Sequence, residues 1–297
     1  MSRRVLHVDE PIDVVTTVRA ITPRAVRSQG GSPGEVWWVA ASPVGAASLR
    51  IVADGARITG EAWGPGSEWA LDRLDDLCGV HDELSGFVPG NGLVAQLHRR
   101  HAGLRMGRTC QVFAALLPVI LGQRVTSDAA RRSYRSISRT FGTTAPGPVE
   151  AWVPPSAEVV AGLDSPVLHP HGVERARADV IIEAARRARR LEEAVAMVPD
   201  EAYRRLTAVR GIGPWTAGHV MGQALGDADS VPIGDFHLPN MVAWALAGEP
   251  RADDTRMLEL LEPYRPHRRR VVVLLKLAKI TAPAFAPRRA VPDFTRS

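Results

Sequence analysis

The chain has 297 residues and a mass of 32.1 kDa, enough to bury a sizeable core in one large or two smaller domains. Hydrophobic residues make up 45% of it, which excludes an intrinsically disordered chain and indicates a globular one. The 37 basic and 32 acidic residues give a formal net charge of +5, which is compatible with a polyanionic partner but does not require one.

The few cysteines and lysines limit the chemistry that the chain can perform. Cys78 and Cys110 are its only cysteines, so it cannot build a four-cysteine zinc or iron–sulfur site, and no iron–sulfur cofactor is expected. The apolar run at Val271–Leu275 is too short to span a membrane and is followed by Lys276 and Lys279, the only lysines. No signal peptide is visible, so we expect a soluble cytoplasmic protein without a membrane partner.

The first 65 residues have the features of short β-strands. Turn residues such as Ser32-Pro33-Gly34 and Asp54-Gly55 separate runs rich in β-branched and aromatic residues, and Asp54-Gly55 is typical of a β-hairpin. The predicted strands are Val36–Ala41, Ser48–Ala53 and Ile58–Trp63. A helical spacing follows from Glu68 to Leu77, with inward positions at Trp69, Leu74 and Leu77. An α+β N-terminal region is therefore expected.

Helices are expected after a glycine-rich linker at Pro89–Arg108. One helix is predicted from Thr109 to Phe141, and three of its arginines lie four residues apart on one face, where they either face water or contact a polyanionic backbone: Arg131, Arg135 and Arg139. A connection rich in Pro, Gly and Ser, residues 142–171, leads to a helix at Val173–Val198, whose many arginines should mostly face water. Helices then alternate with short loops up to Ala282, and a loose tail is expected after them.

The stretch Leu206–Leu246 organises the helical part; it reads LTAVRGIGPWTAGHVMGQALGDADSVPIGDFHLPNMVAWAL. A helix end is followed by the turn Arg210-Gly211-Ile212-Gly213, and a second helix starts at Pro214. The two glycines suit a hairpin whose backbone needs positive φ or closely approaches another surface. Proline loses nothing as the first helical residue, and the free N–H groups and positive dipole end of that helix form a site for a phosphate. A third helix follows Asp235.

These residues resemble the helix-hairpin-helix plus Gly/Pro-Asp signature of the DNA glycosylase superfamily, most closely its alkylated-base (3-methyladenine type II) branch. The match includes the VRGIGPWTA hairpin, the Gly234-Asp235 pair, the ILGQRVT run at Ile120–Thr126 and a run at Pro266–Arg268 that resembles the family's last core helix. The resemblance implies an α+β N-terminal antiparallel-sheet domain, residues 1–105, before an all-α helix-hairpin-helix glycosylase core, residues 106–282, and a tail, residues 283–297.

Asp235 is the expected catalytic residue. It lies just before a helix, whose N-terminus stabilises an ionised carboxylate. Such a carboxylate can stabilise an oxocarbenium-like sugar while the N-glycosidic bond breaks, and it can direct water onto C1′. A simple helix cap is the alternative role for an Asp at this place. The hairpin, the spacing and the order of the core helices favour the catalytic role.

Three residues are expected around a flipped-out base: Trp215, His219 and Lys276. Bifunctional relatives place a nucleophilic lysine at the position of Trp215, so no lyase activity is expected. Trp215 and His219 match pocket positions of the branch, although either could also be an ordinary core residue. An ungapped count from Pro266 puts Lys276 where alkylbase enzymes often carry an aromatic pair. A lysine would repel a cationic base, so either the register is off, or Lys276 points away, or the substrate differs from the usual methylated purines.

Contacts with DNA are expected from a wedge and from the hairpin. Gln123 and Arg124 match the turn from which relatives push a wedge into the gap left by the flipped base; Arg124 could instead contact a phosphate or be a surface residue at a helix bend. The resemblance also implies a monovalent cation held by backbone carbonyls. The hairpin set that meets one phosphate is Arg210, Gly211, Ile212, Gly213 and Thr216, and the cation set is Thr207, Val209 and Ile212.

The function predicted from the sequence is that of a monofunctional DNA N-glycosylase. We expect it to excise damaged, foremost alkylated, purines from double-stranded DNA, to leave an abasic site, and to act as a monomer at the bacterial nucleoid without a redox cofactor. Two alternatives stay open at this point. One is a glycosylase for a bulky, deaminated or oxidised base, and the other is a non-catalytic lesion-binding protein of the same fold.

Overall fold

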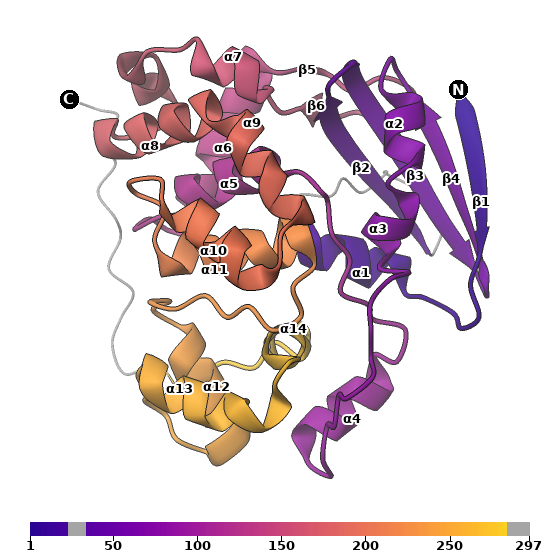
Figure 1. The fold of residues 1–297 in the computed structure, drawn as a ribbon, viewed down its shortest axis with the longest axis vertical. Helices are drawn as coiled ribbons and strands as arrows, with labels where there is room; N and C mark the ends of the chain where they lie inside the picture. The colour runs from indigo at the N-terminus through magenta and orange to yellow at the C-terminus, as the bar shows by residue number, and fades with distance from the viewer. Residues whose placement is uncertain (23–33, 284–297) are drawn as a thin grey trace.

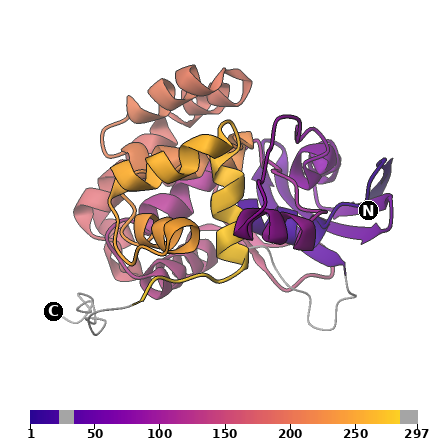
Figure 2. The same ribbon diagram turned by 90° about the horizontal axis from the view of Figure 1, so that it is seen from below.

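The structure of the chain is a computed structural model that describes residues 1–22 and 34–283. A small antiparallel sheet comes first, and mostly helices follow it (Figure 1). Figure 2 shows the sheet on one side of the molecule and the helical part on the other. The mixed class expected from the sequence is confirmed. The turn expected at residues 32–34 and the tail expected at residues 283–297 lie outside the described residues, except for Gly34 and Pro283.

The sheet pairs four strands antiparallel in the order β1-β4-β3-β2. They are β1 (Ser2–His7), β2 (Glu35–Ser42), β3 (Gly45–Asp54) and β4 (Arg57–Trp63). The predicted hairpin is confirmed, because Asp54 pairs with Arg57 and Gly55 has the positive φ, 58°, that a two-residue turn requires. Strand β1 was not predicted, because it lies at the sheet edge and its side chains alternate only weakly between buried and exposed.

Helices account for most of the remaining chain. The first of them are α1 (Val14–Ile21), α2 (Ser67–Leu71), α3 (Leu74–Cys78) and α4 (Leu93–Arg100). Those that follow are α5 (Val112–Leu121), α6 (Ser127–Phe141), α7 (Ala157–Ala161), α8 (Arg175–Arg186), α9 (Ala188–Glu192), α10 (Pro199–Thr207), α11 (Pro214–Val220), α12 (Leu238–Ala247), α13 (Asp254–Leu261) and α14 (Arg268–Leu277). The short elements are β5 (Thr143–Thr144), β6 (Trp152–Val153), η1 (Ser165–His171), η2 (Glu193–Ala196), η3 (Met221–Leu225) and η4 (Glu262–Tyr264).

One face of the sheet packs against α1, α2 and α3. Side chains alternate between the two faces of a strand, so Trp38 of β2 faces this core while its neighbours on the strand turn away. Trp69 of α2 stacks on Trp38 with ring centroids 5.7 Å apart. Leu74 and Leu77 of α3 are fully buried in the same cluster. The inward positions predicted for this segment are therefore confirmed.

The single helix predicted from Thr109 to Phe141 is wrong, because a turn divides it into α5 and α6. Arg124, in the turn, has a left-handed backbone with φ of 57°, which no helix interior accommodates. Thr126 then caps α6 by accepting a hydrogen bond from the Ala129 N–H at 3.3 Å. The helix predicted at Val173–Val198 is likewise broken, at Arg187, into α8, α9 and η2. In both cases the helical spacing of apolar residues continues across the break, so the spacing alone does not indicate where the helix ends.

Two hydrophobic clusters hold the helical part together. One joins α5, α8, α10 and α11, and the other joins α4, α12, α13 and α14. Helix α4 lies within the stretch expected to be a linker, and it packs on α14. The loop that carries Asp235 runs from the first cluster to the second. No helix of residues 1–22 and 34–283 is long and apolar enough to cross a membrane.

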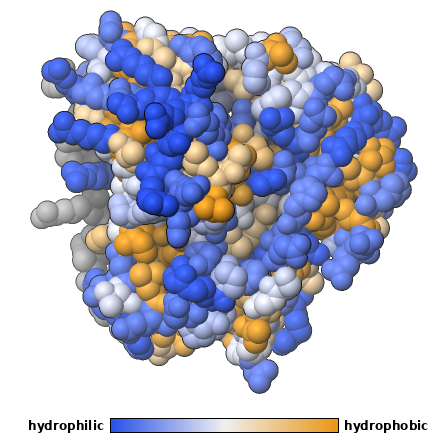
Figure 3. Space-filling model, in the orientation of Figure 1, coloured by the Kyte–Doolittle hydropathy of each residue, from blue (hydrophilic) through white to orange (hydrophobic). Residues whose placement is uncertain are grey.

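The arginines of α8 and α9 mostly face water, as predicted. Figure 3 shows hydrophilic side chains over this part of the surface. Arg177 is the exception: it is buried, and its guanidinium donates a hydrogen bond of 3.0 Å to the carbonyl of Leu121, the last residue of α5. A charged donor at this place satisfies a carbonyl that the helix itself leaves without a partner. It also fixes the start of the turn that carries Gln123 and Arg124.

Candidate active site

A tight hairpin, residues 208–213, joins α10 to α11. The Ile212 N–H donates to the Val209 carbonyl at 3.0 Å, and both side chains are buried in the core. Gly211 has φ of +90°, and a Cβ there would lie 2.2 Å from a methyl carbon of Val180. Gly213 has an extended backbone, and a Cβ there would meet nothing within 4 Å. The first glycine is therefore required by the fold, whereas the second leaves its backbone open to solvent.

Asp235 lies in the loop before α12 and receives three hydrogen bonds. Its Oδ1 accepts from the backbone N–H groups of His237 and Leu238, at 2.9 and 2.8 Å, so the side chain caps α12. Its Oδ2 accepts from the indole Nε1–H of Trp215 at 2.9 Å. Capping of α12 is thus compatible with the expected catalytic role, because the cap occupies Oδ1 and leaves Oδ2 to the indole hydrogen bond. The indole donor comes from α11 and links the hairpin to the Asp235 loop.

The surroundings of Asp235 keep its carboxylate ionised. Burial by itself raises the pKa, but the hydrogen bonds from Trp215, His237 and Leu238 and the charge of Lys276 together lower it below the ordinary value. A carboxyl whose folded pKa is depressed stabilises the fold above its unfolded pKa, and that contribution is lost as the pH falls through the folded pKa. At neutral pH the site therefore contains a half-buried anion.

Replacing Trp215 with Phe should raise the pKa of Asp235, because the largest favourable hydrogen bond to the carboxylate is lost while burial remains. Titration of the side-chain carboxyl carbon by NMR measures this shift. Trp244→Phe on α12 is the matched control, because Trp244 is partly exposed and makes no contact with the carboxylate in the described hydrogen bonds. An unchanged pKa in Trp215→Phe would contradict the assigned indole hydrogen bond.

Trp215 and His219 form an aromatic pair on α11. Their ring centroids lie 4.7 Å apart with planes at 75°, and both side chains are half-buried. Burial, reinforced by the charges of Lys276 and Arg269, lowers the pKa of His219 to about 3. The imidazole is therefore neutral at physiological pH. The two residues that were expected in a pocket thus lie side by side, next to Asp235.

Lys276 of α14 lies on the side of that helix that faces Asp235 and His219. It interacts electrostatically with both Asp235 and His219. Desolvation, followed by the charge of Arg269, lowers the pKa of Lys276, and the charge of Asp235 opposes this shift. Sequence analysis missed a second cation, Arg269, which is buried on the same helix. Its spacing of seven residues from Lys276, two helical turns, was the available signal.

The turn between α5 and α6 is tied to the hairpin. The side-chain amide of Gln123 donates to the carbonyl of Gly211 at 3.0 Å and to the hydroxyl of Thr216 at 2.9 Å. Thr216 is buried, so its hydroxyl serves this internal contact and cannot reach a ligand outside. Arg124 and Arg210 are both exposed next to this junction. The predicted wedge, Gln123 and Arg124, therefore lies directly beside the hairpin at residues 208–213, and the two together form one edge of the molecule.

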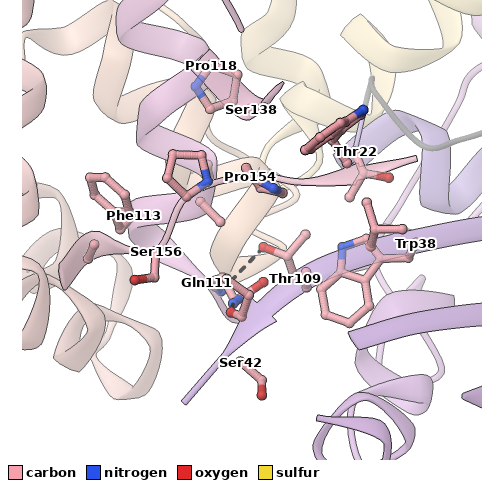
Figure 4. Close-up of a pocket in the computed structure, with 18 of the residues that line it drawn as sticks. Thr22, Trp38, Ser42, Thr109, Gln111, Phe113, Pro118, Ser138, Pro154 and Ser156 are labelled. Atoms are coloured by element: carbon pink, nitrogen blue, oxygen red, sulfur yellow. Dashed lines mark hydrogen bonds between the residues drawn. The ribbon is translucent and has the colours of Figure 1, made fainter. Parts of the chain in front are cut away.

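A cavity that the described residues line lies elsewhere. It has a volume of about 1050 Å³ and opens between β2, the start of α5 and α6. Figure 4 shows Trp38 and Ser42 of the sheet on one side of it and Phe113 and Ser138 of the helical part on the other. None of the residues around Asp235 lines it. The candidate site rests on the constellation of side chains around Asp235 and not on this cavity.

No protein-family model matches the chain. A curated relative, the Bacillus subtilis (strain 168) protein named "Putative DNA-3-methyladenine glycosylase YfjP", is 23% identical over 178 residues. The aligned part is 59% of this chain and 61% of the relative. The chain thus spans less than two thirds of the relative that it matches.

Solved structures share the fold over two thirds of the chain or more. A 3-methyladenine DNA glycosylase from Archaeoglobus fulgidus superposes with a TM-score of 0.78 at 21% identity, covering 94% of this chain and 98% of that one. A Clostridium acetobutylicum 8-oxoguanine glycosylase/lyase bound to double-stranded DNA gives 0.69 at 13% identity, covering 93% and 97%. The Schizosaccharomyces pombe 3-methyladenine DNA glycosylase in complex with abasic DNA gives 0.55 at 19% identity, covering 67% and 98%. The resemblance stated from the sequence is confirmed: these proteins are DNA glycosylases, and the chain has their fold.

Proposed function

We propose that this chain is a monofunctional DNA N-glycosylase that excises damaged, foremost alkylated, purines and leaves an abasic site, the first step of base excision repair. The observation that supports this proposal most is the Asp235 carboxylate, held ionised by three hydrogen bonds beside an aromatic pair. It lies on a fold shared with DNA glycosylases. A protein that only binds DNA has no need for a half-buried anion close to a phosphate-binding edge.

The chemistry requires the damaged nucleotide to leave the duplex and enter the site. As the bond from C1′ to the base nitrogen breaks, its electron pair goes to the base and the sugar becomes oxocarbenium-like. The Asp235 carboxylate stabilises this positive sugar, and it directs a water molecule that adds to C1′ and loses a proton. Trp215 and His219 offer ring faces and edges against which a purine can stack. This arrangement needs no redox cofactor.

The hairpin would bind one DNA phosphate. Arg210 and Gly213 are exposed, and the N–H groups at the start of α11 have no partner within the helix. Such contacts position the protein on the duplex and carry no sequence information. Arg124, next to them, would fill the gap left by the flipped nucleotide; its left-handed backbone, anchored through Gln123, holds the side chain on this edge.

A monovalent cation would fit beside the hairpin. Helix α10 ends at Thr207, so carbonyls at its C-terminal end lack partners within the helix and carry its negative dipole end. Carbonyl oxygens are the ligands that a hard cation prefers. Thr207, Val209 and Ile212 would supply them, and the bound cation would supply a positive charge facing the phosphate. Among the described residues, no group of three His, Cys, Asp or Glu side chains could hold a metal ion.

The monofunctional part of the proposal is tested by the products. With a duplex that carries one damaged base and a 5′ label, the strand should stay unbroken until hot alkali cleaves the abasic site. Sodium borohydride should trap no protein–DNA adduct, because Trp215 occupies the position from which relatives attack with a lysine. An adduct that forms with the wild type and disappears in Lys276→Met would overturn this part and identify Lys276 as a nucleophile.

One observation favours a second candidate within the same reaction class. Lys276 stands where a cationic methylated base would come close to it, which favours a deaminated, oxidised or bulky base as the substrate instead. A non-catalytic lesion-binding protein is the third candidate. Binding without base release on every lesion of a panel would support it over both glycosylase candidates.

A further inference from the structure

Two cations on α14 face the aromatic pair and the Asp235 carboxylate. Arg269 and Lys276 are two helical turns apart and therefore share one face of α14. That face meets η3, which continues α11 directly, because a Cβ on Gly222 of η3 would lie 1.9 Å from Cζ of Arg269. Gly222 follows His219 by three residues along this continuous helical stretch. Lys276 in turn acts electrostatically on His219 and on Asp235.

Arg269 is a buried charge on α14. The side chain is only 7% exposed, and the interaction found for its charge among the described residues is a through-space one with Asp227. Burial lowers the pKa of Arg269 to about 10, and Asp227 opposes this shift only through space. The guanidinium is therefore still charged at neutral pH. A buried cation projects its field into the neighbouring site.

The pKa of His219 responds to both burial and the charges of α14. Burial lowers its pKa most; among the charges, those of Lys276 and then Arg269 lower the pKa more than Asp235 raises it. A positive charge at the imidazole ring is therefore disfavoured even though a carboxylate is close. A cationic purine stacked beside His219 would be repelled by Lys276 and Arg269, whereas an uncharged purine carries no net charge for them to repel.

From this arrangement we infer that the pocket selects damaged purines that are uncharged and carry a hydrogen-bond acceptor, with Lys276 as the specificity-determining residue and Arg269 behind it. This inference rests on the proposed glycosylase function and narrows its damaged, foremost alkylated, purines to uncharged ones. Hypoxanthine, which carries a carbonyl, and 1,N6-ethenoadenine, an alkylated but uncharged purine with ring-nitrogen acceptors, belong to the class. N7-methylguanine and N3-methyladenine in DNA carry a formal positive charge and lie outside it.

The chemistry of the leaving base agrees with this selection. A cationic methylated purine leaves as a neutral base, because the electron pair of the broken bond cancels its charge. An uncharged purine takes the same electron pair and leaves as an anion. The Lys276 ammonium can donate a hydrogen bond or a proton to that anion, while Asp235 faces the positive sugar. A lysine beside the base therefore assists the departure of uncharged purines, which leave as anions. A cationic purine leaves as a neutral base and does not require this assistance.

The test measures binding separately from catalysis. Duplexes that carry a 2′-fluoro nucleotide of hypoxanthine or of N7-methylguanine resist breakage of the glycosidic bond, so affinity can be compared directly. The wild type should bind the hypoxanthine duplex more tightly, and Lys276→Met should reduce this preference about tenfold. Lys276→Arg, which keeps the charge, should retain it. Lys279→Met is the matched control: it removes the same charge three residues further on, where no electrostatic effect on Asp235 or His219 is found.

An unchanged preference in Lys276→Met, or a wild type that favours N7-methylguanine, would overturn the inference. Base release from the corresponding cleavable duplexes separates this result from the fate of the proposed function. If no base is released but the binding preference shifts with Lys276, the pocket inference stands and the glycosylase proposal fails. If bases are released and the binding preference is the same in the wild type and in Lys276→Met, the glycosylase proposal stands and the pocket inference fails.

Discussion

Asp235→Asn should release damaged bases about 1,000-fold more slowly than the wild type while binding the same DNA. Asn has the shape of Asp and is as good a helix cap, and its side-chain oxygen can still accept from the N–H groups of His237 and Leu238. Only the negative charge is lost. Because the carboxylate is held ionised for the positive sugar of the transition state, the rate should fall without a comparable loss of stability or affinity.

A matched control separates charge at this site from helix capping in general. Asp253 caps α13 and accepts from the backbone N–H of Arg256 at 2.9 Å, so Asp253→Asn makes the same chemical change at another helix start. Single-turnover base release, with DNA binding measured for every variant, should show full activity for Asp253→Asn. Equal rates for Asp235→Asn and the wild type would remove Asp235 from the centre of the reaction.

Gly213→Ala should weaken DNA binding about tenfold and leave the free energy of unfolding within about 0.5 kcal/mol of the wild type. In the free protein a methyl group at Gly213 meets nothing within 4 Å, and the extended backbone there suits any residue before Pro214. A glycine that the fold does not need is explained by a ligand that approaches the backbone. Unchanged affinity in Gly213→Ala would contradict the hairpin as the phosphate site.

Gly211→Ala, in contrast to Gly213→Ala, should lower the stability of the fold as well as the affinity for DNA. Its φ of +90° and the nearby Val180 methyl carbon, 2.2 Å from the added Cβ, oblige the hairpin to shift. We expect a loss of about 2 kcal/mol in the free energy of unfolding, together with weaker DNA binding. Chemical denaturation and binding titration of the two variants distinguish a glycine needed for folding from a glycine needed for contact.

Local signals allowed much of the fold to be predicted. The strands before α2 alternate along short runs and are separated by turn residues, and Asp54-Gly55 forms the predicted hairpin. The start of α11 at Pro214 also follows from residues next to each other in the chain. The break between α5 and α6 was missed, because the left-handed backbone of Arg124 has no signature when the residue is not glycine.

The candidate site depends on contacts between distant parts of the chain, and these could be predicted only in part. The resemblance placed Trp215, His219, Lys276 and Asp235 in one site. The indole hydrogen bond to Asp235 and the link from Gln123 to the hairpin join residues 20 to 93 positions apart. No local pattern encodes such contacts, since packing between helices creates them. Arg269 was missed for the same reason: its burial against Gly222 follows from how α14 meets η3.

The most direct test of the proposed function is to identify free bases released from lesion-bearing duplex DNA by mass spectrometry. The wild type should release a damaged purine, with one abasic site formed per base and the strand left intact. Asp235→Asn is the negative control and should release far less free base in the same time. Tight binding to every lesion duplex with no free base detected would contradict the proposed glycosylase and leave a lesion-binding protein in its place.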